Sequence, residues 1–88
     1  MSPPLGSLDA FVVLVLQIVS IHVEPAAITP DTTLASDLSL DSISLISLMA
    51  LTEERFGVSF AEHAENVAQL RTVGDAIALI ELLAAARV

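Results

Sequence analysis

The chain has 88 residues, with 11 acidic residues against three arginines, no lysine and no cysteine. Its net charge of −8 excludes nucleic-acid binding, which needs a cationic face, and argues against docking on an anionic membrane. The absence of cysteine excludes disulfides, a thiolate zinc site and a protein thiol nucleophile.

The composition indicates one small helical domain. The length suffices for a single domain, here taken as residues 1–88, and 55% apolar residues give it enough to bury. Aromatic residues make up 3% of the chain, whereas β-sandwich strands carry more of them. We therefore expect an all-α fold.

The first helix is expected from Ser7 to about Ile21. Residues 11–19 are almost wholly apolar, and the β-branched residues among them leave a strand as the alternative. The apolar run of about 13 residues is too short for a bilayer, which needs roughly 20, and no basic residue precedes it as in a signal peptide. A buried helix of a cytoplasmic protein is the prediction.

This helix has little polar surface of its own. From Phe11 to Val19 only Gln17 is polar, whereas a surface helix usually keeps a polar face. We therefore expect some of Val12, Val15 and Val19 to be exposed, or covered by a second copy or a partner.

The next segment, residues 23–40, is a long loop rich in turn residues such as Pro25 and Pro30. Long loops in compact domains usually have a function or their own anchoring. We expect an ordered loop pinned to the core by Ile28, Leu34, Leu38 and Leu40.

A second helix is expected from about Asp41 to Phe56, ended by Gly57. Its predicted packing stripe consists of Ile43, Ile46, Met49 and Ala50, widened by Leu45, Leu48 and Leu51.

One or two helical turns are expected within residues 61–70. A last helix should begin at Thr72, which can cap it in a capping box with Asp75. Its predicted buried stripe consists of Val73, Ile77, Ile80 and Ala84. The predicted fold is a four-helix bundle with three longer helices, a short third helix and a long first connection.

Catalytic and metal sites find little support. His22, at the end of the first helix, and His63 lie near no nucleophile-elbow pattern, and Glu62 and Glu65 beside His63 resemble an ordinary solvated face. Glu53 and Glu54 are adjacent, so they point in different directions on a helix. We predict no catalytic residues and no metal ligands.

Ser42 is the main candidate for a functional residue. A serine at a helix start commonly satisfies orphan N–H groups, but Asp41 can already do this. The Ser42 hydroxyl is then free to face solvent, where the helix N-terminus would stabilise an attached phosphate.

Residues 37–57, D-L-S-L-D-S-I-S-L-I-S-L-M-A-L-T-E-E-R-F-G, resemble the modification motif of acyl carrier proteins. In that family D-S-L or D-S-I marks the serine that receives 4′-phosphopantetheine. The loop I-T-P-D-T-T-L and the segment T-V-G-D at residues 72–75 also resemble the family, over roughly residues 8–85.

The resemblance implies that Ser42 is the attachment site and that Asp41 and Ile43 are its recognition context. A phosphopantetheinyl transferase would attach the arm from coenzyme A with Mg²⁺. The arm's thiol would hold acyl groups as thioesters for acyl-loading, condensing or acyltransferase enzymes. The protein itself would not be an enzyme.

The sequence departs from discrete fatty-acid carriers, which have acids two and five residues after the serine. Here these positions are Ser44 and Ser47. The departure favours a specialised pathway such as polyketide or mixed polyketide–peptide assembly, the kind of chemistry used in antibiotic biosynthesis, over primary fatty acid biosynthesis. Expected docking residues are Ser44, Leu45, Ser47, Met49, Glu53 and Glu54.

Two alternatives stay open. One is an aminoacyl or peptidyl carrier, which D-S-I also fits, although a Gly-Gly before the serine motif is missing. The other is an unmodified helical interaction module that uses its apolar first helix. The start at Met1 and the short ends fit a free-standing protein, and a cloned domain would look the same.

Overall fold

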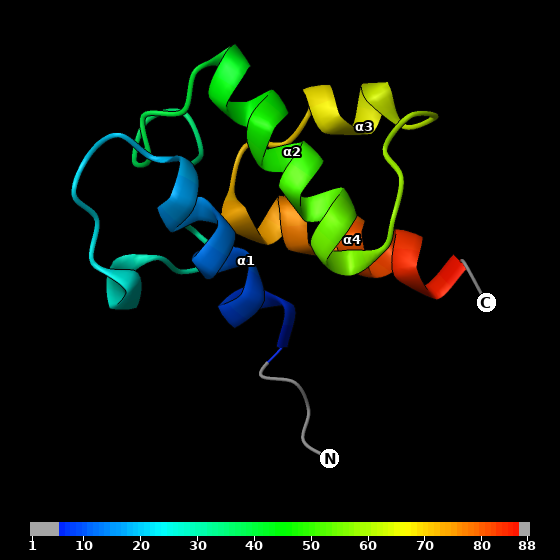
Figure 1. Cartoon of the computed structure of the whole chain (residues 1–88), viewed down its shortest axis with the longest axis horizontal. Coiled ribbons are helices and arrows are strands. Elements are labelled where there is room, and N and C mark those ends of the chain that lie inside the picture. Colours follow the sequence, from blue (N-terminus) through cyan, green and yellow to red (C-terminus); the bar gives the residue numbers. More distant parts are fainter. Residues whose placement is uncertain (1–5, 87–88) are drawn as a thin grey trace.

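The computed structural model describes residues 6–86, and within that range the regular structure is helical. Figure 1 shows α2 lying across α4, with α1 beside both, α3 at one end, and a long loop joining α1 to α2. This arrangement confirms the expected all-α, four-helix fold. The elements are α1 (Gly6–Ile18), the short 3-10 helix η1 (Pro25–Ala27), α2 (Ser42–Phe56), α3 (Ala64–Ala68) and α4 (Val73–Ala86).

The first helix, α1, packs against both α2 and α4. The segment is a helix and not a strand, and its residues Phe11 and Val15 are fully buried. The helix ends at Ile18, three residues before the expected Ile21. At 13 residues it is short, and no helix in residues 6–86 is long and apolar enough to cross a membrane.

Some of Val12, Val15 and Val19 were expected to be exposed or covered by another chain, but Val12 and Val15 of α1 are buried within the fold itself. Val15 is 0% and Val12 9% exposed, and Val19 is half-buried. The exposed apolar residues are instead Val13 and Leu16. When a helix is apolar nearly all round, its apolar pattern cannot select the buried face. Any self-association through α1 would therefore have to use Val13 and Leu16, and it stays a prediction.

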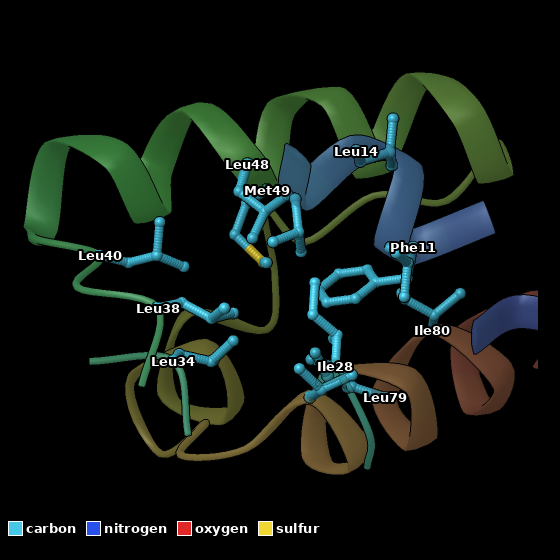
Figure 2. Close-up of a cluster of buried hydrophobic side chains, with 14 of the residues drawn as sticks. Phe11, Leu14, Ile28, Leu34, Leu38, Leu40, Leu48, Met49, Leu79 and Ile80 are labelled. Atoms are coloured by element: carbon cyan, nitrogen blue, oxygen red, sulfur yellow. The ribbon is translucent and has the colours of Figure 1, made fainter. Parts of the chain in front are cut away.

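The loop between α1 and α2 is anchored as expected. Its apolar side chains enter the core, where Figure 2 shows Ile28 near Phe11 and Leu79, with the leucines of the loop further along below α2. Burial of these side chains offsets the entropy lost on ordering a long loop. The four buried anchors are Ile28, Leu34, Leu38 and Leu40.

The same loop is tied to the start of α4 by backbone hydrogen bonds. The N–H of Leu34 donates to the carbonyl of Arg71 (2.8 Å), and the N–H of Val73 donates to that of Thr32 (2.9 Å). The N–H of Gly74 donates to the carbonyl of Pro30 (2.8 Å). A Cβ at position 74 would lie only 3.0 Å from that carbonyl oxygen, so this close approach favours glycine.

We therefore predict that Gly74→Ala destabilises the protein. Glycine-to-alanine changes inside helices usually stabilise by about 0.5–1 kcal/mol, but here the hydrogen-bonded loop has little room to retreat. Overpacking should reverse the sign and lower the free energy of unfolding in urea by about 1 kcal/mol. Ala78→Gly, at an exposed position of α4, is the control for ordinary helix propensity. A gain in stability for Gly74→Ala would contradict the prediction.

The bounds of α2 agree with the sequence, but its buried face differs from the predicted stripe. Gly57 ends the helix in the left-handed conformation (φ 68°), as expected. The fully buried positions include Leu48 and Thr52, whose hydroxyl donates to the Leu48 carbonyl (2.7 Å). Of the predicted stripe Met49 is buried, whereas Ile43, Ile46 and Ala50 are exposed. Among the residues expected to widen the stripe, Leu48 is buried and Leu45 and Leu51 are half-buried. Apolar residues of α2 occur on several sides of the helix, so its packing against α1 determines which face is buried.

The last helix, α4, begins with the expected capping box. The N–H of Asp75 donates to the Thr72 hydroxyl (3.1 Å), and the N–H of Thr72 donates to the Asp75 carboxylate (3.2 Å). Of the predicted inward stripe, Val73 and Ile80 are buried and Ile77 and Ala84 are half-buried. The buried face also includes Ala76, Leu79 and Leu83.

Candidate functional site

Ser42 is the first residue of α2 and is exposed, as predicted. Asp41 caps the helix: the N–H of Ser44 donates to its carboxylate oxygen Oδ1 (2.7 Å), and the N–H of Leu45 donates to its carbonyl (2.9 Å). Because Asp41 satisfies these donors, the Ser42 hydroxyl is not needed as a cap. The hydroxyl is therefore accessible to another molecule.

The capping bonds also affect the charge beside Ser42. Hydrogen bonds from Ser44, first its backbone N–H and then its hydroxyl, hold the pKa of the Asp41 carboxyl below its ordinary value. These bonds favour the charged form of the carboxylate. Asp41 is therefore an anion at neutral pH.

The loop before Ser42 is folded by Asp37. Its carboxylate accepts the N–H of Thr33 (2.9 Å), and its own N–H donates to the Thr33 hydroxyl (2.9 Å). Ser39 has a positive φ of 54°, a conformation that favours glycine. Leu38 and Leu40, on either side of Ser39, are buried. The part of the loop that precedes Ser42 is thus fixed by buried leucines on both sides of the tight turn at Ser39.

Beside the same helix lies an apolar groove between α2 and α3, with a volume of about 470 Å³. At one end the N–H of Phe60 donates to the carboxylate of Glu53 (2.6 Å), which ties the connection after α2 to the helix. The sequence reading missed this groove, although the apolar residues of the weak third segment were a signal for it. The groove is lined by Leu45, Ile46, Met49, Ala50, Glu53, Phe60, Ala61, Ala64, Val67 and Ala68.

The predicted docking residues do not form one exposed face. Ser47 and Glu54 are exposed. Ser44, Leu45 and Glu53 are half-buried, and Met49 is buried at 7% exposure. Met49 therefore contributes to the core and to the groove wall, which corrects its expected place on a docking surface. A docking role for the exposed members of the set stays a prediction.

The two histidines lie apart. His22 is exposed, four residues beyond the end of α1 rather than at it, and its Nε2 pairs with the carboxylate of Glu24 (2.9 Å). His63 is half-buried at the start of α3. Within the described range, no group of three His, Cys, Asp or Glu side chains is arranged to hold a metal ion.

Comparison with known proteins identifies the family of this chain. A family model described as the phosphopantetheine attachment site matches residues 13–80. A meromycolate extension acyl carrier protein of Mycobacterium tuberculosis is 41% identical over 61 residues, which are 69% of this chain and 51% of the relative. The chain belongs to the acyl carrier protein family. An acyl carrier protein of Rhodococcus erythropolis is also 40% identical over 63 residues, 72% of this chain and 67% of that protein.

Family membership confirms the resemblance seen in the sequence and its cofactor, covalently attached 4′-phosphopantetheine. Acyl carrier proteins are carriers and not enzymes. The site fits the group because Ser42 provides an exposed hydroxyl at a helix N-terminus, where the helix dipole favours a phosphodiester. The aligned segment spans about half the length of the mycobacterial relatives.

Because carboxylates cap both α2 and α4, we expect the free energy of unfolding to depend on pH in the acid range. Hydrogen bonds from the N–H groups of Arg71 and Thr72 lower the pKa of Asp75, as those from Ser44 lower that of Asp41. A carboxyl with a lowered folded-state pKa stabilises the protein above its unfolded-state pKa of about 4, and the contribution is lost as pH falls through the folded-state value.

We therefore expect the free energy of unfolding, measured in urea, to decrease as pH falls below about 4. Asp41→Asn with Asp75→Asn should flatten this decrease, because asparagine also accepts the capping bonds but does not titrate. Asp31→Asn, at an exposed acid of the loop, is the control. An unchanged pH profile in the double variant would show that other carboxyls cause the acid sensitivity.

Proposed function

We propose that Ser42 carries the 4′-phosphopantetheine arm and that the protein presents acyl groups on it to partner enzymes. The observation that carries this proposal is the exposed Ser42 at the first position of α2, with Asp41 as the helix cap. When bound, the arm supplies a thiol that holds an acyl group as a thioester.

Attachment would take place at the Ser42 oxygen. With a phosphopantetheinyl transferase and Mg²⁺, Ser42 Oγ attacks the phosphorus of coenzyme A that bears the pantetheine. The new Oγ–P bond replaces the bond to the second phosphate, adenosine 3′,5′-bisphosphate leaves, and the hydroxyl proton is lost to a base. The exposed Ile43, next to Ser42, would contact the transferase together with Asp41.

The proposed partners after attachment are acyl-loading, condensing or acyltransferase enzymes of a specialised pathway. Serines at positions 44 and 47 in place of acids support polyketide-type assembly, as does the exposed apolar pair Ile43 and Ile46. A second candidate is the extension of long acyl chains, which the name of the mycobacterial relatives favours. An aminoacyl carrier is the third.

The test is the mass of the intact protein. Incubation with a broad-specificity transferase, coenzyme A and Mg²⁺ should add the mass of one phosphopantetheine. Loading enzymes for malonyl, long-chain acyl and aminoacyl groups then distinguish the three pathways by the mass that each adds. No phosphopantetheine gained with several transferases would overturn the proposed function.

A further inference from the structure

A second cleft opens beside the start of α2, on the side of the long loop. Its volume is about 370 Å³, and its walls come from residues 33–36 and Leu40 of the loop, from Leu45 of α2, and from Leu70 and Arg71 before α4. Leu40 and Leu45 lie two residues before and three residues after Ser42. The cleft is therefore within reach of a group attached to Ser42.

The walls of this cleft are held in place by backbone contacts. Leu34 N–H donates to the Arg71 carbonyl (2.8 Å), and Thr33 and Thr72 form an isolated antiparallel bridge. Leu34 and Leu40 are buried, so the loop side is anchored in the core. A preformed cleft lowers the entropy cost of ordering a flexible group within it.

The chemistry of the cleft differs from that of the groove between α2 and α3. The groove is apolar except for Glu53, a carboxylate that would repel a phosphodiester. The cleft includes the hydroxyl residues Thr33 and Ser36 and the cation Arg71. The polar, anionic section of a phosphopantetheine arm is therefore complementary to the cleft and not to the groove.

Arg71 is one of two arginines in residues 6–86, and the other, Arg55, is in the last turn of α2, at the opposite end from Ser42. The side chain of Arg71 is exposed, and its charge contributes to the lowered pKa of Asp75. A phosphodiester at Ser42 would share this cation with Asp75. The negative phosphodiester would also be repelled by the carboxylates of Asp37 and Asp41, and a nearby cation would offset this repulsion.

From these observations we propose that the phosphodiester and the adjoining pantoyl section of the arm lie in the cleft, with Arg71 as their counterion. This inference rests on the proposed attachment at Ser42. The phosphodiester end of the arm then lies on the side of α2 that faces the long loop, while the thiol end remains free to extend toward a partner.

NMR of the 88-residue chain loaded with unacylated phosphopantetheine tests the inference. We expect nuclear Overhauser effects between the pantoyl methyl protons and the methyl groups of Leu40 or Leu70. Loading should also shift the amide resonances of Ser36 and Arg71. In Arg71→Gln these effects should fall to less than half, and Arg71→Lys should largely retain them. Arg55→Gln removes the same charge at the far end of α2 and should change nothing.

Effects to Ala61 or Ala64 of the groove instead, or none between the arm and any protein side chain, would overturn the inference. Equal effects in Arg71→Gln and the parent would overturn the role of Arg71. Mass spectrometry of each sample distinguishes this failure from a failure of the proposed function. A parent that gains no phosphopantetheine overturns both, whereas a loaded parent without the contacts overturns only the placement of the arm.

Discussion

Ser42→Ala should abolish the gain of phosphopantetheine completely while leaving the fold intact. The variant lacks the only oxygen that the proposed attachment uses, so the loss should be all-or-none. Because Ser42 is exposed and Asp41 provides the cap, the free energy of unfolding should change by no more than about 0.5 kcal/mol. Intact mass after incubation with transferase, coenzyme A and Mg²⁺ measures the first effect, and urea denaturation measures the second.

Two neighbouring serines are the matched controls. Ser44→Ala and Ser47→Ala change the same type of residue on the same helix, two and five positions further along. Both should still gain one phosphopantetheine. Modification of Ser42→Ala, or loss of modification in Ser47→Ala with Ser42 intact, would show that the assignment of Ser42 is wrong.

The second large effect is expected where partner enzymes meet α2. Ile43 and Ile46 are 76% and 68% exposed, and their spacing of three residues places them on one face beside Ser42. Burying an isoleucine side chain contributes about 1.5–3 kcal/mol, and 1.4 kcal/mol corresponds to a tenfold change in affinity. Ile46→Ser should therefore lower kcat/KM of the dedicated partner enzyme by about tenfold or more.

Leu82→Ser is the matched control for this effect. Leu82 is 62% exposed on α4, so the substitution removes a comparable apolar side chain from a different face. It should leave kcat/KM nearly unchanged. An equal loss in both variants would indicate a general effect on the fold or solubility rather than docking through α2.

Salt dependence separates apolar docking from charge docking on the same helix. Surface charge pairs mainly set the encounter rate and are screened by salt. If Ile43 and Ile46 dominate, kcat/KM with the dedicated enzyme should change little between low and moderate salt. A collapse over this range would show that the exposed acids Asp37, Asp41 and Glu54 carry the docking.

The structure indicates which of the two serines is better suited to a test of the missing acids. Ser44 is half-buried, and its N–H donates to Asp41, so an aspartate there would face the capping carboxylate. Ser47 is exposed and has no such conflict among the described contacts. Ser47→Glu is therefore the cleaner variant for asking whether an added acid improves use by fatty-acid enzymes.

The sequence by itself determined the features that depend on neighbours a few residues away. Asp41 as a cap, Gly57 as a helix end, and the Thr72–Asp75 capping box all follow from local hydrogen bonding and backbone conformation. The exposed Ser42 followed from the same reasoning, since a second capping residue was already present. The anchoring of the long loop was predictable because its few apolar residues had no other place to be buried.

Only the tertiary structure decided which faces of the apolar helices are buried. On α1, Val12 and Val15 turned inward and Val13 outward, and on α2, Ile43 and Ile46 turned outward while Thr52 entered the core. Helical periodicity identifies a buried face when the opposite face is polar, and neither helix has such a contrast. The choice depends on packing between elements distant in sequence. The same packing forms the groove and the cleft on either side of Leu45.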